Sequence, residues 1–157
     1  MTQTKSARPG LESRGMESAP GTARLSTVLA SVPGVAEQSL RATLESLPSI
    51  KVVGTAAGCL SAMQMVRASQ ADLVVIDANL PFEDVRVFLQ QLRKDGLATY
   101  AFVLAATSSQ VRHALAAGAD VALRRDASIR QLSNAVDQIP LHVTGAPEPD
   151  DEILSGI

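Results

Sequence analysis

The stretch "ADLVVIDANLPFED", residues 71–84, joins an uninterrupted aliphatic run to a charged end. Four aliphatic residues, Leu73 to Ile76, stand between Asp72 and Asp77 with no polar residue among them. Such a run indicates a strand that is buried on both faces, as in a parallel sheet. Pro81 soon ends the extended segment, so Asp77 is predicted at the tip of the strand. A charge at this position is costly unless it has a partner or a role.

Strands and helices alternate five times between residues 26 and 139. Aliphatic runs predict strands at 26–31, 50–56, 72–77, 100–106 and 120–124. Apolar residues at helical spacing predict helices at 34–47, 58–69, 83–95, 108–117 and 128–139. This alternation is typical of an α/β fold with right-handed crossovers. We predict a doubly wound five-stranded parallel sheet of order 2-1-3-4-5, the flavodoxin-like arrangement.

Each predicted helix has an apolar face that we expect to pack on the sheet. These faces carry Leu40, Leu44 and Leu47; Leu60, Met63 and Val66; Val85, Phe88, Leu89 and Leu92; Val111, Ala114 and Leu115; and Ile129, Leu132, Val136 and Ile139. Gly96 and Gly118 are predicted to end two of the helices. Asp126 or Ser128 is available to cap the last one.

The regions on either side of residues 26–139 differ from the α/β pattern. Residues 1–25 and 140–157 are rich in Pro, Gly and polar residues and show neither a strand nor a helix period. We interpret them as a disordered N-terminal tail and a flexible acidic C-terminal tail, with one domain, residues 26–139, between them. After residue 140 the sequence has too few residues for a helix-turn-helix module, so we expect a stand-alone domain.

Composition excludes several classes of protein. The net charge of −2 argues against direct nucleic-acid binding, which needs an electropositive face. No apolar run is long enough to span a membrane, and the N-terminus has no secretory pattern. Cys59 is the only cysteine, so no internal disulfide forms and a reducing cytoplasm is expected. It is more simply a packing residue than a nucleophile.

The topology predicts where a site would lie. Ligands of this fold bind at the carboxyl ends of the strands, where the strand order reverses between the first and third strands. Asp77 ends the third predicted strand, while Ser31 and Val32 end the first. The plainer interpretation is that Asp77 caps a helix or lies at a solvated strand end. The switch-point position favours a site.

Three stretches carry a resemblance to a known family. They are "LRATLESLPSIKVVGTAAG" (40–58), "ADLVVIDANLP" (71–81) and "AAGADVALRRDAS" (116–128). In this order and spacing they resemble the receiver domain of bacterial two-component response regulators, over about residues 26–139. Within that family they are most similar to receivers that usually carry a C-terminal helix-turn-helix.

The resemblance implies roles for several residues. Asp77 matches the phosphoacceptor, and Asn79 matches the position whose backbone carbonyl reaches a metal. Arg125 stands where the family has a Lys that binds phosphoryl oxygens. The positive charge is kept, but a planar guanidinium replaces a compact ammonium group. Thr107 lies close to the family's Thr or Ser position and is a second candidate phosphate contact. That position itself falls on Ala105 or Ala106.

Other positions depart from the family pattern. Ser31 and Val32 replace the two acids that hold Mg²⁺, which leaves Asp77 and the Asn79 carbonyl as the remaining metal ligands. Mg²⁺ prefers hard oxygens in an octahedral array, so we expect weak binding if any. Ala122 replaces an aromatic residue that many relatives carry on the last strand. Phosphorylation of Asp77 is therefore expected to be slow and poorly coupled to the surface.

Three functions follow from these observations. The first is a stand-alone, non-enzymatic signalling protein of a phosphorelay, with Asp77 as phosphoacceptor and output through residues 108–139. The second is a pseudo-receiver, a docking module that works without phosphorylation. The third, a small nucleotide-binding protein or enzyme on this fold, lacks a phosphate loop or catalytic set. The implied partners are a sensor histidine kinase, a phosphotransfer protein or a downstream signalling protein, and a homodimer is left open.

Overall fold

A five-stranded parallel sheet forms the centre of the molecule. The structure is a computed structural model, and it describes residues 24–139. The strands are β2 (Leu25–Ala30), β3 (Ile50–Ala56), β4 (Leu73–Ile76), β5 (Tyr100–Ala105) and β6 (Val121–Arg124). They lie in the order β3-β2-β4-β5-β6, and every neighbouring pair is parallel. By rank along the chain this is 2-1-3-4-5, which confirms the predicted fold.

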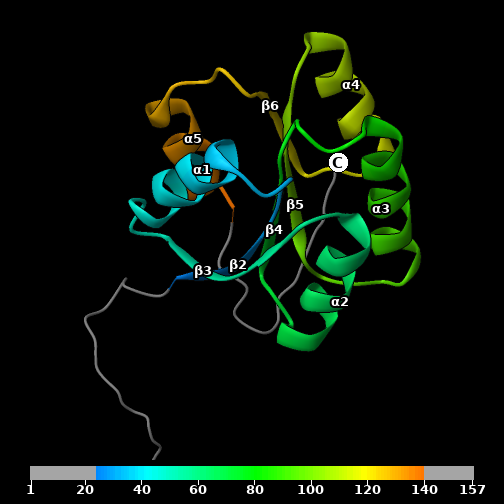
Figure 1. Ribbon diagram of the computed structural model, residues 1–157. Helices are drawn as coiled ribbons and strands as arrows, with labels where there is room; N and C mark the ends of the chain where they lie inside the picture. Colours follow the sequence, from blue (N-terminus) through cyan, green and yellow to red (C-terminus); the bar gives the residue numbers. More distant parts are fainter. Residues whose placement is uncertain (1–23, 140–157) are drawn as a thin grey trace, which may run out of the picture.

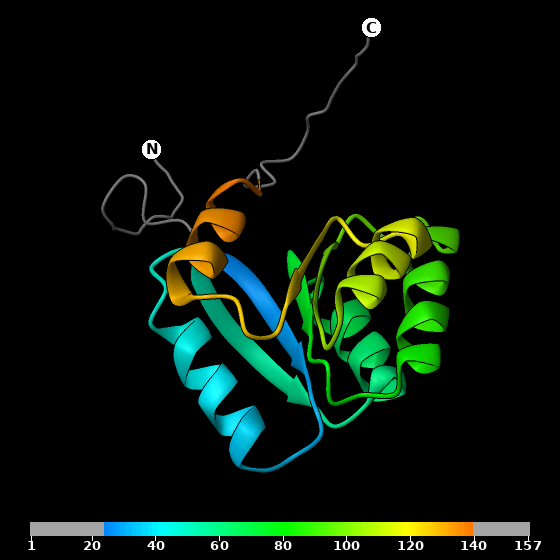
Figure 2. The ribbon, with the colours of Figure 1, turned by 90° about the horizontal axis from the view of Figure 1, so that it is seen from above.

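Helices cover both faces of the sheet. They are α1 (Val35–Glu45), α2 (Cys59–Ser69), α3 (Phe82–Lys94), α4 (Ser108–Ala117) and α5 (Ile129–Asp137). Figures 1 and 2 show α1 and α5 on one face and α2, α3 and α4 on the other. The sheet therefore has a hydrophobic core on each side, as the unbroken aliphatic strands predicted.

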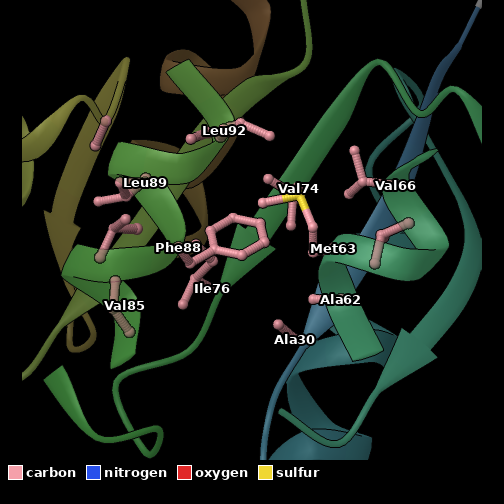
Figure 3. Packing of buried hydrophobic residues seen from close by; sticks show 14 of the residues in the cluster. Ala30, Ala62, Met63, Val66, Val74, Ile76, Val85, Phe88, Leu89 and Leu92 are labelled. Atoms are coloured by element: carbon pink, nitrogen blue, oxygen red, sulfur yellow. The ribbon is translucent and has the colours of Figure 1, made fainter. Parts of the chain in front are cut away.

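The larger core lies between the sheet and helices α2, α3 and α4. In β4, Val74 and Ile76 point into it and are fully buried. Figure 3 shows them against Phe88, Leu89 and other residues of α3. The smaller core, under α1 and α5, takes the alternate residues of the same strands. This is the alternation of side chains that a strand dictates.

Element ends agree with the sequence prediction to within two residues. Gly96 and Gly118 follow α3 and α4 with positive φ angles of 69° and 121°, conformations that favour glycine. Of the two candidate caps for α5, Ser128 is used: its hydroxyl accepts a hydrogen bond from the backbone of Gln131 in a capping box. Leu25, which we assigned to the N-terminal tail, is the first residue of β2. The remaining residues of the two predicted tails lie outside the described range, except Arg24.

The prediction that apolar helix faces are buried is wrong for three residues. Leu60 is 77% exposed, Leu115 46% and Ile129 54%. Each has the spacing of its helical stripe, yet its neighbours leave it exposed. Helical spacing identifies a face but does not tell how much of it a neighbour buries.

The pairing of β2 with edge strand β3 contains an irregularity. Thr27 pairs with Val52, and the next residue, Val28, pairs with Gly54, so Val53 is skipped. Val53 is 44% exposed, whereas Val28 is fully buried. An extra residue in one strand of a pair is a β-bulge, which bends that strand and increases its twist locally.

The packing of α3 predicts that truncation of Leu89 strongly lowers the free energy of unfolding. Leu89→Ala removes a fully buried side chain from the larger core and leaves a cavity, so the free energy of unfolding should fall by about 2–5 kcal/mol. Val87→Ala, at a 62% exposed position of the same helix, is the control and should change it by less than about 0.5 kcal/mol. Urea denaturation measures both. Equal effects would contradict the packing described.

Candidate functional site

Three strand ends meet at the carboxyl edge of the sheet. Backbone hydrogen bonds continue the strand pairing by one residue: Ser31 N donates to Ala56 O at 3.0 Å, and Asp77 N donates to Ala30 O at 2.9 Å. On the other side, Arg125 N donates to Ala105 O at 2.8 Å. Ser31, Asp77 and Arg125 are therefore fixed in register by the backbone, and their side chains converge.

The carboxylate of Asp77 is completely buried and paired with a cation. Its Oδ2 accepts hydrogen bonds from Ser31 Oγ at 2.9 Å and from Arg125 Nη2 at 3.2 Å. Its Oδ1 lies 2.8 Å from Arg125 Nε, within ion-pair distance. The Nε–H does not point at this oxygen, so Oδ1 has no aligned hydrogen bond. Arg125 keeps 41% of its side chain exposed and so connects the buried charge to the surface.

Asn79 joins the site through its side chain. Its Oδ1 accepts a hydrogen bond from the backbone N–H of Val32 at 3.1 Å, and its Nδ2 donates to Ser31 Oγ at 3.1 Å. Sequence reasoning considered only the backbone carbonyl of Asn79. The amide orients the Ser31 hydroxyl toward Asp77 and fixes the loop that follows β2.

Thr107 and Asp77 are not brought together. The Thr107 hydroxyl accepts a hydrogen bond from Gln110 N at 3.1 Å and caps the N-terminus of α4. Within residues 24–139 no hydrogen bond joins Thr107 to Asp77. The pattern Thr-x-x-Gln at 107–110 has the spacing of a capping box, so this use of the hydroxyl was available from the sequence. Ala105 and Ala106, at the end of β5, have no side-chain hydroxyl.

The residues at this edge do not fit a magnesium site. Mg²⁺ is typically bound through one or two carboxylates in octahedral oxygen geometry. Here a hydroxyl and an aliphatic side chain, Ser31 and Val32, end β2, and the single carboxylate is already neutralised by Arg125. The described part of the chain contains no group of three or more His, Cys, Asp or Glu that could hold a metal.

A search of protein-family models finds one that covers more than half of this sequence. Residues 34–137 match the response regulator receiver domain. The chain belongs to the response regulator receiver family. This is a family of signalling domains rather than enzymes, so the third function considered from sequence is not supported.

Known relatives agree with this assignment. The receiver shares 28% identity over 100 residues with a probable C4-dicarboxylate response regulator, DctR, of Priestia megaterium, covering 62% of this chain and 44% of DctR. The chain thus spans less than half of this curated relative.

Solved receiver structures share the fold. The signal receiver domain of NarL from Mycobacterium tuberculosis superposes with a TM-score of 0.65 at 22% identity, covering 73% of this chain and 94% of that one. A LuxR-family two-component response regulator from Aurantimonas sp. SI85-9A1 gives a TM-score of 0.63 at 24% identity, with coverages of 74% and 85%. These likenesses show the shared receiver fold.

Two further residues with reactive side chains, His113 and Cys59, lie on helices α4 and α2. His113 is exposed on α4, where its ring is 6.4 Å from that of Phe82. Cys59 begins α2, and burial, followed by the nearby charge of Asp84, raises the pKa of its thiol from 9.0 to about 11.

No helix within residues 24–139 has the length and apolar character required to cross a bilayer.

The ion pair predicts that Arg125→Ala destabilises the receiver. Removing the guanidinium leaves a buried carboxylate with one hydrogen bond, and because Arg125 is 41% exposed we expect a loss of about 1–3 kcal/mol rather than the full cost of a buried pair. Arg124→Ala is the matched control. Its pair with Asp126 is on the surface, so its loss should cost less than about 0.5 kcal/mol.

A double-mutant cycle with Asp77→Asn checks the origin of this loss. In the Asp77→Asn background no buried charge remains to be neutralised, so Arg125→Ala should cost clearly less than in the wild type. Urea denaturation of the four proteins gives the coupling. Equal costs in both backgrounds would contradict an Arg125–Asp77 pair.

The raised pKa of Cys59 predicts slow alkylation. The thiolate is the reactive form, so at pH 8 iodoacetamide should react about 100-fold more slowly than with a thiol of pKa 9.0. The rate should keep rising above pH 9 toward pH 11. The same chain unfolded in urea is the control, and a plateau near pH 9 in the folded protein would show that burial does not act on Cys59 as described.

Proposed function

We propose that this receiver is a docking module of a two-component pathway that works without phosphorylation, with contact to a downstream signalling protein as its output. The observation that carries the proposal is the Asp77 carboxylate, which is 0% exposed and is ion-paired with Arg125. The charge at the phosphoacceptor position is thus neutralised by the chain itself.

The chemistry of phosphoryl transfer supports this proposal. A carboxylate that attacks phosphorus must be accessible, and cations and donors must surround the transferred group. In this receiver Asp77 is covered, Ser31 and Val32 replace the metal-binding acids, and Ala105 and Ala106 follow β5 in place of a hydroxyl. Each of these changes slows the reaction, and together they remove the usual stabilisation of the transferred phosphoryl group.

A protein partner is the output that the surface supports. Helices α4 and α5 expose Leu115 and Ile129, at 46% and 54%, on either side of β6. A net charge of −2 does not favour nucleic acid as a direct partner. A cytoplasmic setting is consistent with the single, unpaired cysteine. A stand-alone receiver stays a prediction from the sequence, and the chain spans 44% of the length of DctR.

A second candidate function is phosphorylation of Asp77 by a sensor histidine kinase or phosphotransfer protein. The observation that favours it is the state of Oδ1, which has no aligned hydrogen-bond donor. The lone pairs of Oδ1 become available to attack phosphorus if the side chain of Arg125 moves away from Asp77. In this case Arg125 would contact the phosphoryl oxygens instead of the free carboxylate.

Intact mass spectrometry after incubation with acetyl phosphate and Mg²⁺ separates the two functions. We expect no phosphoryl adduct on the wild type. The variant Ser31→Asp/Val32→Asp, which restores two metal-binding carboxylates, should gain an acid-labile adduct at Asp77 if its thermal unfolding remains cooperative. Adding Asp77→Asn to that variant is the control and should abolish the adduct.

The opposite result would assign the second function. An acid-labile adduct on the wild type that is absent from Asp77→Asn would show that Asp77 is a working phosphoacceptor. The docking proposal would then be abandoned, since a phosphoryl group on Asp77 would replace its pair with Arg125.

A further inference from the structure

We propose that residues 150–154 of this chain, Asp-Asp-Glu-Ile-Leu, dock in the groove between α1 and α5 beside Arg125. The groove shares Ile129 and Arg125 with the surface and the site used in the function above. It rests on the shape and charge of the groove and on the sequence and reach of this segment.

The groove is apolar at its floor. It encloses about 540 Å³, a volume within the range of ligand pockets, and Leu40, Leu104 and Leu132 line it. Ile129 stands at its edge and is 54% exposed. Figure 2 shows α1 and α5 side by side on one face of the sheet. An apolar hollow edged by an exposed isoleucine favours an aliphatic occupant.

A guanidinium group, which also pairs with Asp77, lies at one end of the groove. Arg125 lines it with a partly exposed guanidinium. The one carboxylate in the lining, Asp126, is already paired with Arg124 at 2.9 Å. The first turn of α5 carries no acidic residue, and its N-terminus is capped by Ser128 and Gln131. Carboxylates are the complementary groups for this end.

Residues 150–154 have this chemistry in the required order. Three acids, Asp150, Asp151 and Glu152, are followed at once by Ile153 and Leu154. Carboxylates beside Arg125 would leave the two aliphatic side chains over the leucines of the groove floor. The acids give orientation, and the burial of two aliphatic side chains supplies the favourable free energy.

The chain length allows the segment to reach the groove. Helix α5 has nine residues, so it rises about 14 Å from its beginning near Arg125 to its end at Asp137. Residues 140–149 span at most about 35 Å when extended. The segment can therefore return along α5 to the carboxyl edge of the sheet.

A second groove serves as the comparison. It lies between α2 and α3, encloses about 680 Å³ and exposes Leu60 and Val87. Asp84 lines it, and no Lys or Arg does. An acidic segment would be repelled there, so charge favours the α1–α5 groove. Docking in the α1–α5 groove would also cover Ile129. A protein partner that uses α5 would have to displace the segment.

Hydrogen exchange of the full chain tests the proposal. In the variant Ile153→Asp/Leu154→Asp, amides of residues 39–43 and 129–132 should exchange roughly threefold faster than in the wild type. Leu60→Asp, at an exposed apolar position of the other groove, is the control and should leave these amides unchanged. A synthetic peptide of residues 146–157 should restore slow exchange to the double variant.

The same experiment tests whether the three acidic side chains of the segment contribute to docking. A peptide with Asp150→Asn, Asp151→Asn and Glu152→Gln should fail to restore protection at low salt. Unchanged exchange in the Ile153→Asp/Leu154→Asp variant would overturn the proposal. Protection of the wild type that appears only at high protein concentration would also overturn it, because the occupant would then be a second copy. Neither result depends on whether Asp77 is phosphorylated.

Discussion

A carboxylate with no exposure to solvent must be paired inside the protein, and this requirement organises the carboxyl edge of the sheet. A buried unpaired charge is among the most costly features that a fold can contain. Asp77 meets the requirement through Arg125 and Ser31. Asn79 orients the serine in turn. The backbone continues the strand pairing to bring these side chains into register, so the sheet and the ion pair support each other.

An internal ion pair differs from a switch in one physical respect. A switch needs two states of similar free energy, and a signal must favour one of them. The Arg125–Asp77 pair is present without any signal. The hydroxyl of Thr107 is used by a helix cap, and Ala122 has no side chain large enough to move between two positions. These features support the proposal of a docking module that works without a phosphorylation switch.

Most of the fold can be predicted from the sequence, because the sequence signals for strands and helix ends are local and occur in several elements. Uninterrupted apolar runs specify β4 and β5, and glycines with positive φ follow α3 and α4. The position of Asp77 follows from topology alone. The exposure of Leu60 does not, since it depends on how far the sheet extends beneath α2. The role of the Asn79 amide depends on its rotamer and on a loop distant in sequence, which no local pattern encodes.

The bulge in edge strand β3 has a consequence for how copies of this protein meet. Open edges of sheets tend to pair with other strands, and irregular edges with charged residues resist this. β3 skips Val53 in its pairing, contains Gly54 and exposes Lys51. A continuous sheet across two molecules would have to form over this irregular border. Sheet extension through β3 is thereby disfavoured, so on this side of the molecule side chains rather than backbone groups determine which molecules fit.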